Sequence, residues 1–412
     1  MKRLLSLFVS LLITMGIWAQ DEMLNTPLTL EAINPGTISV DILWAGAISY
    51  RLNDEDMQTC TSAPIEVNPG DKVAIYGERN YLSRINCSAD CYVYGNVMSL
   101  ISSTDYSNLK TLSSGNGFES LFSFNSHIKN HPTKQLVLPA TELSESCYDN
   151  MFAGCTGLTK APELPATTLA DFCYNSMFSG CSNLEEAPQL PATKLSRSCY
   201  QYMFQGCKKI AEAPELPATD LSKACYYGMF SGCTSLTKAP ELPATKLAGH
   251  CYGAMFMNCS ALTEAPALPA TSLATDCYIG MFQECSSLIK APILPAKTLL
   301  QSCYYEMFAG CSKLNSVTCL ATNISANVCL MDWLRGVSET GTFVKAPKVN
   351  WPTNQSGIPQ GWAVEDYSST DITTTIVKKS ATPSTAFDLM GRKLTPNKKG
   401  LKIVEGRKYV VK

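Results

Sequence analysis

Charged side chains are scarce in this chain of 412 residues, in which Asp, Glu, Lys and Arg make up 17%, with 33 basic against 35 acidic residues. The formal net charge of -2 excludes the strongly basic surface that nucleic acids and anionic membranes require of a partner. Histidine is rarer still, since only His127, His131 and His250 occur. We therefore expect no histidine-based catalysis and no metal site. His127 and His131 are four residues apart, but no carboxylate or cysteine cluster accompanies them.

Long apolar runs are also missing, apart from residues 4–18. Lys2 and Arg3 precede this run and Ala19 and Gln20 follow it, which is the order found in a secretory signal peptide. The run is short for a membrane-spanning helix, and the absence of a cysteine directly after Ala19 argues against a lipid anchor. We expect residues 1–20 to be a signal peptide. The mature protein is then secreted or held at the cell surface, outside the outer membrane and without a transmembrane segment.

Cysteine, in contrast, is abundant, with 19 residues, and most of these cysteines recur at a fixed interval. Two cysteines eight residues apart appear seven times, each time 26 residues further on, without insertion or deletion. A constant period of this length predicts a solenoid in which each unit stacks on its neighbours. The pairs are Cys147 and Cys155, Cys173 and Cys181, Cys199 and Cys207, Cys225 and Cys233, Cys251 and Cys259, Cys277 and Cys285, and Cys303 and Cys311.

The two ends of this array depart from the regular unit. At the exit, Cys329 keeps its place, but Trp333, Leu334 and Val337 stand where Met, Phe and Cys are expected. At the entry, the segment from Ile128 to Leu138 is four residues longer than its counterparts. Atypical end units are expected because the terminal faces of a stack have no neighbour to cover them.

Residue spacing within one unit predicts its secondary structure. The apolar residues Leu169, Cys173, Met177 and Cys181 follow one another at intervals of four, which indicates about three turns of helix. Gly180 lies in the last turn and suits a helix stop. The segment 158–164 contains Pro162, so it is expected to be only a short strand. Each unit is therefore predicted to be a short strand, a turn fixed by proline and one helix.

The full unit follows the motif C-Y-x-x-M-F-x-G-C-x-x-L-x-x-A-P-x-L-P-A-T-x-L, and the pattern extends over residues 118–350. It resembles the leucine-rich repeats of BspA-like bacterial surface proteins. The resemblance implies an α/β solenoid of leucine-rich repeats over residues 106–350, with an entry unit, seven regular units and a worn exit unit. It also implies a non-enzymatic surface protein that acts through protein binding.

The segments on either side of the array lack the period. Residues 27–105 contain short alternating runs between turns such as Asn68-Pro-Gly, which predicts a small all-β, sandwich-like domain. This segment resembles the module that precedes such repeats in the same surface proteins. Residues 351–380 are expected to be a polar linker. Residues 381–412 are expected to form a β tail that resembles the sorting modules of type IX secretion, and whether the tail is cleaved is open.

The repeating cysteines allow several chemistries. If each unit holds a helix, two cysteines eight apart are ~12 Å apart along it, and equivalent cysteines on neighbouring helices are ~8 to 10 Å apart. Both distances exceed the ~7 Å limit for a disulfide. Evenly spread cysteines do not converge on a zinc ion, and no histidine repeats beside them to activate a thiol. We expect all fourteen to be free and buried, forming a structural ladder. Cys60, Cys87 and Cys91 lie outside the ladder, and one disulfide among them is possible, with the pair undetermined.

Exposed positions of the array supply the candidate interaction face. One column contains Lys160 and its counterparts, and another contains Glu163 and its counterparts. Opposite charges on adjacent units would give weak surface pairs of ~0 to 1 kcal/mol, so a merely solvated surface is the alternative. The candidate residues are Lys160, Glu163, Glu186, Gln189, Glu212, Glu215, Lys238, Glu241, Glu264 and Lys290.

Two functions compete on this sequence. The first is adhesion, in which the repeat face binds a protein of a host cell, a neighbouring cell or the matrix. The second is glycan binding by the N-terminal β-domain. Its stacking residues would be Trp44, Tyr50, Tyr76, Tyr81, Tyr92 and Tyr94. We expect no enzymatic activity and no cofactor, because no triad, metal motif or phosphate loop has a usable spacing.

Overall fold

The computed structural model describes residues 22–42, 48–78, 82–113, 117–354, 356–368, 400–404 and 407–411. Residues up to 365 form one compact unit and residues 366–412 form another, and each is described by itself. The expected signal peptide lies outside the described residues, as do residues 369–399 of the expected linker and tail. In the second unit, β15 (Gly400–Val404) pairs antiparallel with β16 (Arg407–Val411).

In the part of the chain that the structure describes, eight strands precede the repeats and belong to two sheets. One sheet contains β1, β3, β4, β6 and β8, the other β2, β5 and β7. Alternate apolar residues such as Leu30, Val73 and Ile85 are buried in one common core, which is the pattern of a sandwich. The strands are β1 (Leu28–Ala32), β2 (Gly36–Ile42), β3 (Ile48–Leu52), β4 (Gln58–Thr59), β5 (Ile65–Val67), β6 (Lys72–Gly77), β7 (Leu82–Cys87) and β8 (Cys91–Asn96).

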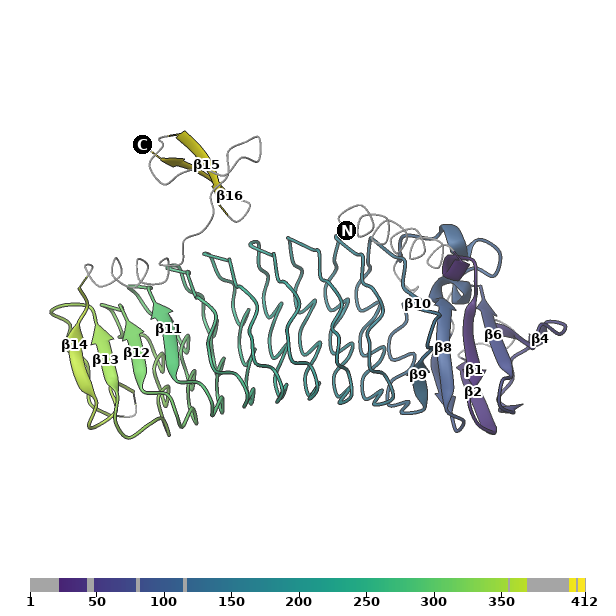
Figure 1. The fold of residues 1–412 in the computed structure, drawn as a ribbon, viewed down its shortest axis with the longest axis horizontal. Helices are drawn as coiled ribbons and strands as arrows, with labels where there is room; N and C mark the ends of the chain where they lie inside the picture. Colours follow the sequence, from purple (N-terminus) through teal and green to yellow (C-terminus); the bar gives the residue numbers. More distant parts are fainter. Residues whose placement is uncertain are drawn as a thin grey trace, which may run out of the picture. The chain divides into compact units, whose positions relative to one another are not determined.

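Strand β8 joins the sandwich to the array. It pairs in parallel with β9 (Ile128–Asn130) and with β10 (Leu136–Val137), which flank the insertion in the entry unit. Between β8 and the array lie two short 3-10 helices, η1 (Val97–Leu100) and η2 (Tyr106–Asn108). The first rung of the array is therefore covered by a strand, and Figure 1 shows the following rungs stacked side by side from β10 towards β11.

The segment of each unit that carries the cysteines is a ribbon of consecutive turns. In residues 172–181, every second N–H donates to a carbonyl of the next unit, as Tyr174 does to Cys199 at 3.0 Å. The N–H groups between them donate three residues back, as Met177 does to Tyr174 at 3.3 Å. Every fourth residue has a positive φ, such as Ser176 at 51° and Gly180 at 76°. Two residues point inward and two outward in each period of four.

The prediction of a helix in each unit was wrong, although the predicted solenoid is present. Among the described residues, helix is limited to residues 22–24, η1 and η2. A true helix has 3.6 residues per turn, so three consecutive steps of four turn the apolar line by about 120° around its axis. The spacing from Leu169 to Cys181 contains three such steps and no step of three. A turn with a period of four keeps all of these residues on one side.

Substituting Ala224 by glycine separates a turn ribbon from a helix. Ala224 has a φ of 54°, a left-handed conformation that costs an L-residue roughly 1–2 kcal/mol. We expect Ala224→Gly to raise the free energy of unfolding by about 1 kcal/mol, as measured by urea denaturation. If Ala224 lay in a helix, the same substitution would lower the free energy of unfolding by about the same amount. Ala153 lies in the same kind of ribbon without a positive φ, so Ala153→Gly should destabilise. Destabilisation by both substitutions would contradict the turn ribbon.

The opposite side of each unit is extended, and proline decides how regularly it pairs. Through the middle of the array, neighbouring units share only isolated parallel bridges, such as Lys160 with Glu186 and Lys238 with Glu264. Pro162 and its counterparts have no N–H to donate. Thr318 replaces this proline at the exit, and there β12 (Ser316–Cys319) pairs with β13 (Thr342–Lys345) in an unbroken parallel register. β11 (Lys290–Leu294) still contains Pro292 and pairs with β12 with a register shift between Lys290 and Ile293. β14 (Ala363–Asp366) lies beside β13 in the same four-stranded sheet.

Aromatic rings stack along the core, one ring per unit in each of two ladders. Phe122 to Phe308 form one ladder with centroids 5.4–5.9 Å apart. Tyr148 to Tyr304 form the other, with centroids 5.6–6.0 Å apart. Trp333 ends the tyrosine ladder and stacks on Trp351. The core is thus sealed at the exit by indole rings.

Candidate interaction face

The ten predicted face residues lie on the extended side of the array and are all exposed. They comprise six glutamates, three lysines and one glutamine, which gives this face a formal charge of -3. Lys160 and Glu186 form an ion pair at 3.2 Å, as expected. The second expected pair, Lys238 with Glu264, is not among the ion pairs that the described residues form.

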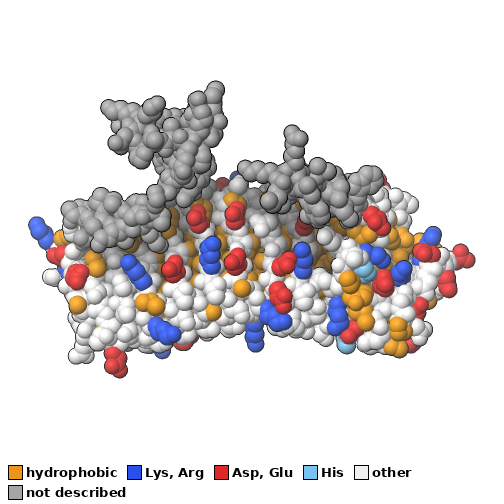
Figure 2. Space-filling view, in the orientation of Figure 1, with side chains coloured by type: hydrophobic (Ala, Val, Ile, Leu, Met, Phe, Trp, Pro, Cys, Tyr) orange, Lys and Arg blue, Asp and Glu red, His pale blue; other side chains and the backbone are white. Residues whose placement is uncertain are grey.

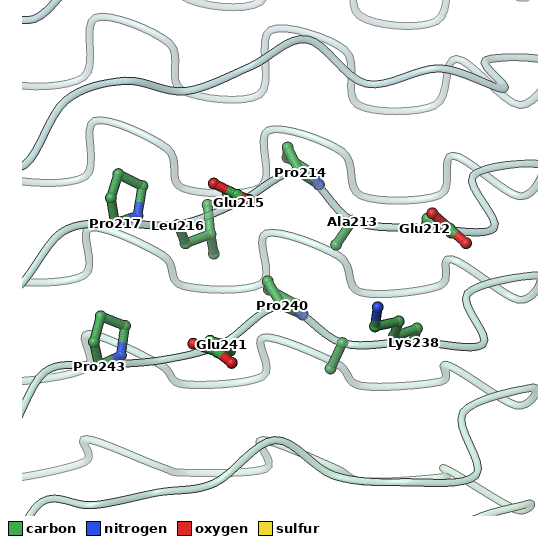
Figure 3. Close-up of a pocket in the computed structure, with 11 residues that line it drawn as sticks. Glu212, Ala213, Pro214, Glu215, Leu216, Pro217, Lys238, Pro240, Glu241 and Pro243 are labelled. Atoms are coloured by element: carbon green, nitrogen blue, oxygen red, sulfur yellow. The ribbon is translucent and has the colours of Figure 1, made fainter. Parts of the chain in front are cut away.

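Two columns of prolines border the glutamate column, a feature that the charge pattern alone did not indicate. Pro214 and Pro240 belong to the inner column and are buried, while Pro217 and Pro243 belong to the outer column and are exposed. Figure 3 shows the rings of each column directly above one another in adjacent units, with Glu215 and Glu241 between the columns. The A-P-x-L-P spacing of the motif carries this arrangement, because it repeats both prolines every 26 residues.

Grooves lie between adjacent units on this face. One has a volume of about 370 Å³ and is lined by the 212–217 and 238–243 segments. The next groove, of about 380 Å³, lies between Pro240 and Pro269 and contains Glu241 and Ala267. Towards the exit the column turns apolar, with Ile293 at 43% and Ile289 at 51% exposure. Figure 2 shows acidic and basic side chains in rows along this part of the array. The column of Glu163 therefore changes from acidic to apolar, while the column of Lys160 stays charged up to Lys290.

The cysteines face inward and take part in backbone contacts. All nineteen cysteines of the sequence lie in the described part of the chain and are free thiols. The second cysteine of each regular unit donates its S–H to a phenylalanine carbonyl of the preceding unit, as Cys207 does to Phe178 at 3.1 Å. Burial raises the pKa of the Cys173, Cys181 and Cys225 thiols to about 12. Such thiols are poor nucleophiles.

The geometric reason for excluding disulfides in the ladder needs correction. Adjacent units are joined by parallel bridges, so equivalent Cα atoms are about 4.8 Å apart, not 8 to 10 Å. This separation lies within the range that a disulfide spans. Cysteines related by translation have Cβ atoms as far apart as their Cα atoms, however, while a disulfide needs Cβ atoms at about 3.8 Å. Disulfides between ladder cysteines are therefore disfavoured because the side chains point in parallel directions.

Two of the three cysteines in the sandwich are neighbours. The neighbouring Cys91 lowers the pKa of Cys87, and Asn125 Nδ2 at 3.4 Å from the Cys87 sulfur acts in the same direction, while burial opposes both. The Cys91 thiol itself donates to the carbonyl of Ala89 at 3.4 Å. Burial alone raises the pKa of Cys60 to about 11. Cys60, Cys87 and Cys91 are all free thiols in the structure, so the disulfide considered for this domain is not present there.

Thiol reactivity in the native protein should follow these differences. We expect Cys87, which is half-buried, to be the first cysteine that iodoacetamide labels near neutral pH, because its lowered pKa leaves more thiolate. The fourteen ladder cysteines should react only after denaturation, and then in most copies without prior reduction. Peptide mass mapping at increasing labelling times measures both. Early labelling of Cys173 or its counterparts would contradict a buried ladder.

The aromatic residues suggested for glycan stacking are dispersed or covered. Trp44 and Tyr81 lie outside the described residues. Tyr94 is only 3% exposed, with Lys134 Nζ 4.1 Å above its ring and its hydroxyl donating to Glu31 at 3.0 Å. Tyr92 packs edge-on against His131, and Tyr50 and Tyr76 are half-buried in their strands. In the described part of the sandwich these rings present no common platform.

Comparison with known proteins agrees with the geometry of the array. The family described as "BspA type Leucine rich repeat region (6 copies)" matches residues 120–263 and 226–329. No curated protein and no solved structure matches this chain. In the described residues, no group of three or more His, Cys, Asp or Glu side chains is arranged to hold a metal ion. The same residues contain no helix that is long and apolar enough to span a membrane.

Proposed function

This chain belongs to the BspA-type leucine-rich repeat family, and we propose that it is an exported adhesion protein that binds a protein partner through the extended side of its array. The family indicates a surface role in protein–protein interaction and is typically non-enzymatic. The partner is a protein of a host cell, a neighbouring cell or the matrix.

One observation carries the proposal. The exposed columns of the extended side continue over six successive units, from Lys160 to Lys290 and from Glu163 to Ile293, at a constant interval. Beside these columns the exposed outer proline recurs unchanged in five successive units, at Pro165, Pro191, Pro217, Pro243 and Pro269. A partner that engages several of these prolines gains affinity by multivalency.

Reversal of charge on this face tests the proposal. We expect the triple variant Glu163→Lys, Glu215→Lys and Glu241→Lys to lose most of the binding of the intact protein to immobilised matrix proteins and to cell surfaces. A matched control reverses Glu55, Glu145 and Glu339, which are exposed elsewhere, and should bind normally. Equal binding by both variants, or binding to a glycan array in place of protein, would overturn this function.

Export and surface retention are part of the same proposal and need their own test. Fractionation of cells that express the chain with and without residues 381–412 should place the intact protein at the surface and the shortened one elsewhere. An intact protein found only in the cytoplasm would exclude adhesion.

A further inference from the structure

The groove between the third and fourth of the six units that carry the exposed columns, lined by residues 212–217 and 238–243, has an amphipathic character. Its walls are the apolar rings of Pro214, Pro217, Pro240 and Pro243, with Ala213, Leu216 and Ala239 between them. Its polar groups are the carboxylates of Glu212, Glu215 and Glu241 and the ammonium group of Lys238. Three carboxylates against one cation leave an excess of negative charge in the groove. Figure 3 shows Glu215 and Glu241 side by side between the two proline columns.

Arginine and lysine side chains match such a lining. Their aliphatic stems lie along apolar surfaces while the charged heads stay in water. A guanidinium group also matches a carboxylate with two parallel hydrogen bonds. A stem lying on Pro217 and Pro243 would therefore place its charged head beside Glu215 and Glu241. The volume of about 370 Å³ is ample for one such side chain together with water.

The neighbouring grooves differ in a fixed order. The next groove towards the exit keeps Glu241 but has Ala267 in place of the second carboxylate. One unit further, Ile293 occupies the same column and is 43% exposed, and Ile289 beside β11 is 51% exposed. A segment that follows the column of Glu215, Glu241, Ala267 and Ile293 therefore meets carboxylates at one end and apolar side chains at the other, although Glu264 and Lys290 lie beside the apolar end. This order defines the chemistry of an occupant and the order of its side chains along the array.

We propose that the extended side of the array, from Glu212 to Ile293, is the docking site for an extended segment of the partner protein in which an arginine or lysine residue lies to one side of apolar residues. The cationic side chain occupies the groove between Glu215 and Glu241, and the apolar residues lie on Ala267 and Ile293. This inference rests on the proposed function and specifies the partner sequence that the face selects.

The test uses the full chain and a fluorescein-labelled synthetic peptide in which two arginines precede two leucines, with glycine between them. Fluorescence anisotropy should show saturable binding. We expect Glu215→Gln with Glu241→Gln to weaken binding about tenfold, which corresponds to about 1.4 kcal/mol for two exposed ion pairs. The control, Glu145→Gln with Glu339→Gln, removes the same charge elsewhere and should change binding less than about twofold. A peptide with glutamine in place of arginine should bind no better to the wild type than to the groove variant.

A second pair of variants tests the walls of the groove independently of charge. Pro217→Ser with Pro243→Ser removes two exposed rings and leaves every carboxylate in place. This double variant should bind the arginine peptide less tightly than the wild type does, and the difference should persist at high salt, where long-range electrostatic attraction is screened. Unchanged melting temperatures verify that each variant is folded.

Three results would overturn the inference. The first is that the peptide shows no saturable binding, and the second is that the groove glutamine variant and its control lose peptide affinity equally. The third is that the proline double variant binds the peptide as tightly as the wild type. If the groove variants nevertheless bind matrix proteins less well than the wild type, the proposed function stands and only this partner chemistry fails. If the wild type binds the peptide but binds no cell or matrix surface, the proposed function fails and only the peptide-binding property of the groove is supported.

Discussion

Deletion of one whole unit, residues 211–236, is expected to leave a folded protein that unfolds cooperatively. The deletion joins Ile210 to Thr237, and Ile210 and Leu236 occupy equivalent buried positions. Every column of the core therefore continues in register across the junction, and the array loses one unit and one interface. Circular dichroism during urea denaturation measures the transition, which should shift to a somewhat lower urea concentration.

A deletion of half a unit is the matched control. Removing residues 211–223 joins Ile210 to Ala224 and leaves a turn ribbon without its extended partner segment. The stacked Phe204 and Phe230 then no longer lie one period apart, and the hydrogen bonds between neighbouring ribbons cannot form. We expect loss of the cooperative transition and of secretion. Equal tolerance of both deletions would show that the 26-residue period does not set the stacking.

Truncation of one ladder ring, Phe230→Ala, should lower the free energy of unfolding by about 3–5 kcal/mol. Phe230 is fully buried and stacks on Phe204 at 5.7 Å and on Phe256 at 5.9 Å. The loss combines the removed apolar area, the cavity and two stacked contacts. Urea denaturation of the intact chain measures it.

An exposed phenylalanine of the same array provides the control for this substitution. Phe124 is 75% exposed, so Phe124→Ala should change stability by less than about 1 kcal/mol. Similar losses for both variants would mean that the ring ladder does not stabilise the array more than any surface aromatic residue.

The period, the buried columns and the exposed columns could be predicted from the sequence, because they depend only on residue type at fixed intervals. Cys173, Met177 and Phe178 are buried, as are their counterparts in the other regular units. Lys160 and Glu163 are exposed, as are their counterparts. The effect of Pro162 was also visible in advance. A residue without an N–H cannot complete a strand ladder, and regular strands form where Thr318 replaces it.

The backbone of the ribbon could not be predicted from apolar spacing alone, because period four is close to the period of a helix. Two signals for a ribbon were present in the sequence. One was the uninterrupted series of steps of four from Leu169 to Cys181, and the other was Gly180 at a position that takes a positive φ in every copy. The hydrogen bond from the Cys207 thiol to the Phe178 carbonyl could not be predicted either, because it links two units and depends on the backbone of the ribbon.

The proline grooves were missed because the interaction face was predicted from charge alone. Pro217 and Pro243 are separated by a whole unit in the sequence, and only the close spacing of the units makes them two walls of one groove. The environment of Cys87 also depended on tertiary contacts, because Asn125 reaches its sulfur from the entry unit.

The spacing of the units underlies both the ribbon and the face, and a distance between two spin labels on the face measures it directly. Labels introduced as unnatural amino acids at Glu163 and Ile293 are five units apart. Parallel bridges between units predict a backbone separation of about 24 Å, at about 4.8 Å per unit. Packed helices would give about 40 Å or more. Pulsed electron resonance on the intact protein should find the shorter distance, and the longer one would contradict the stacked-turn solenoid and its interaction face.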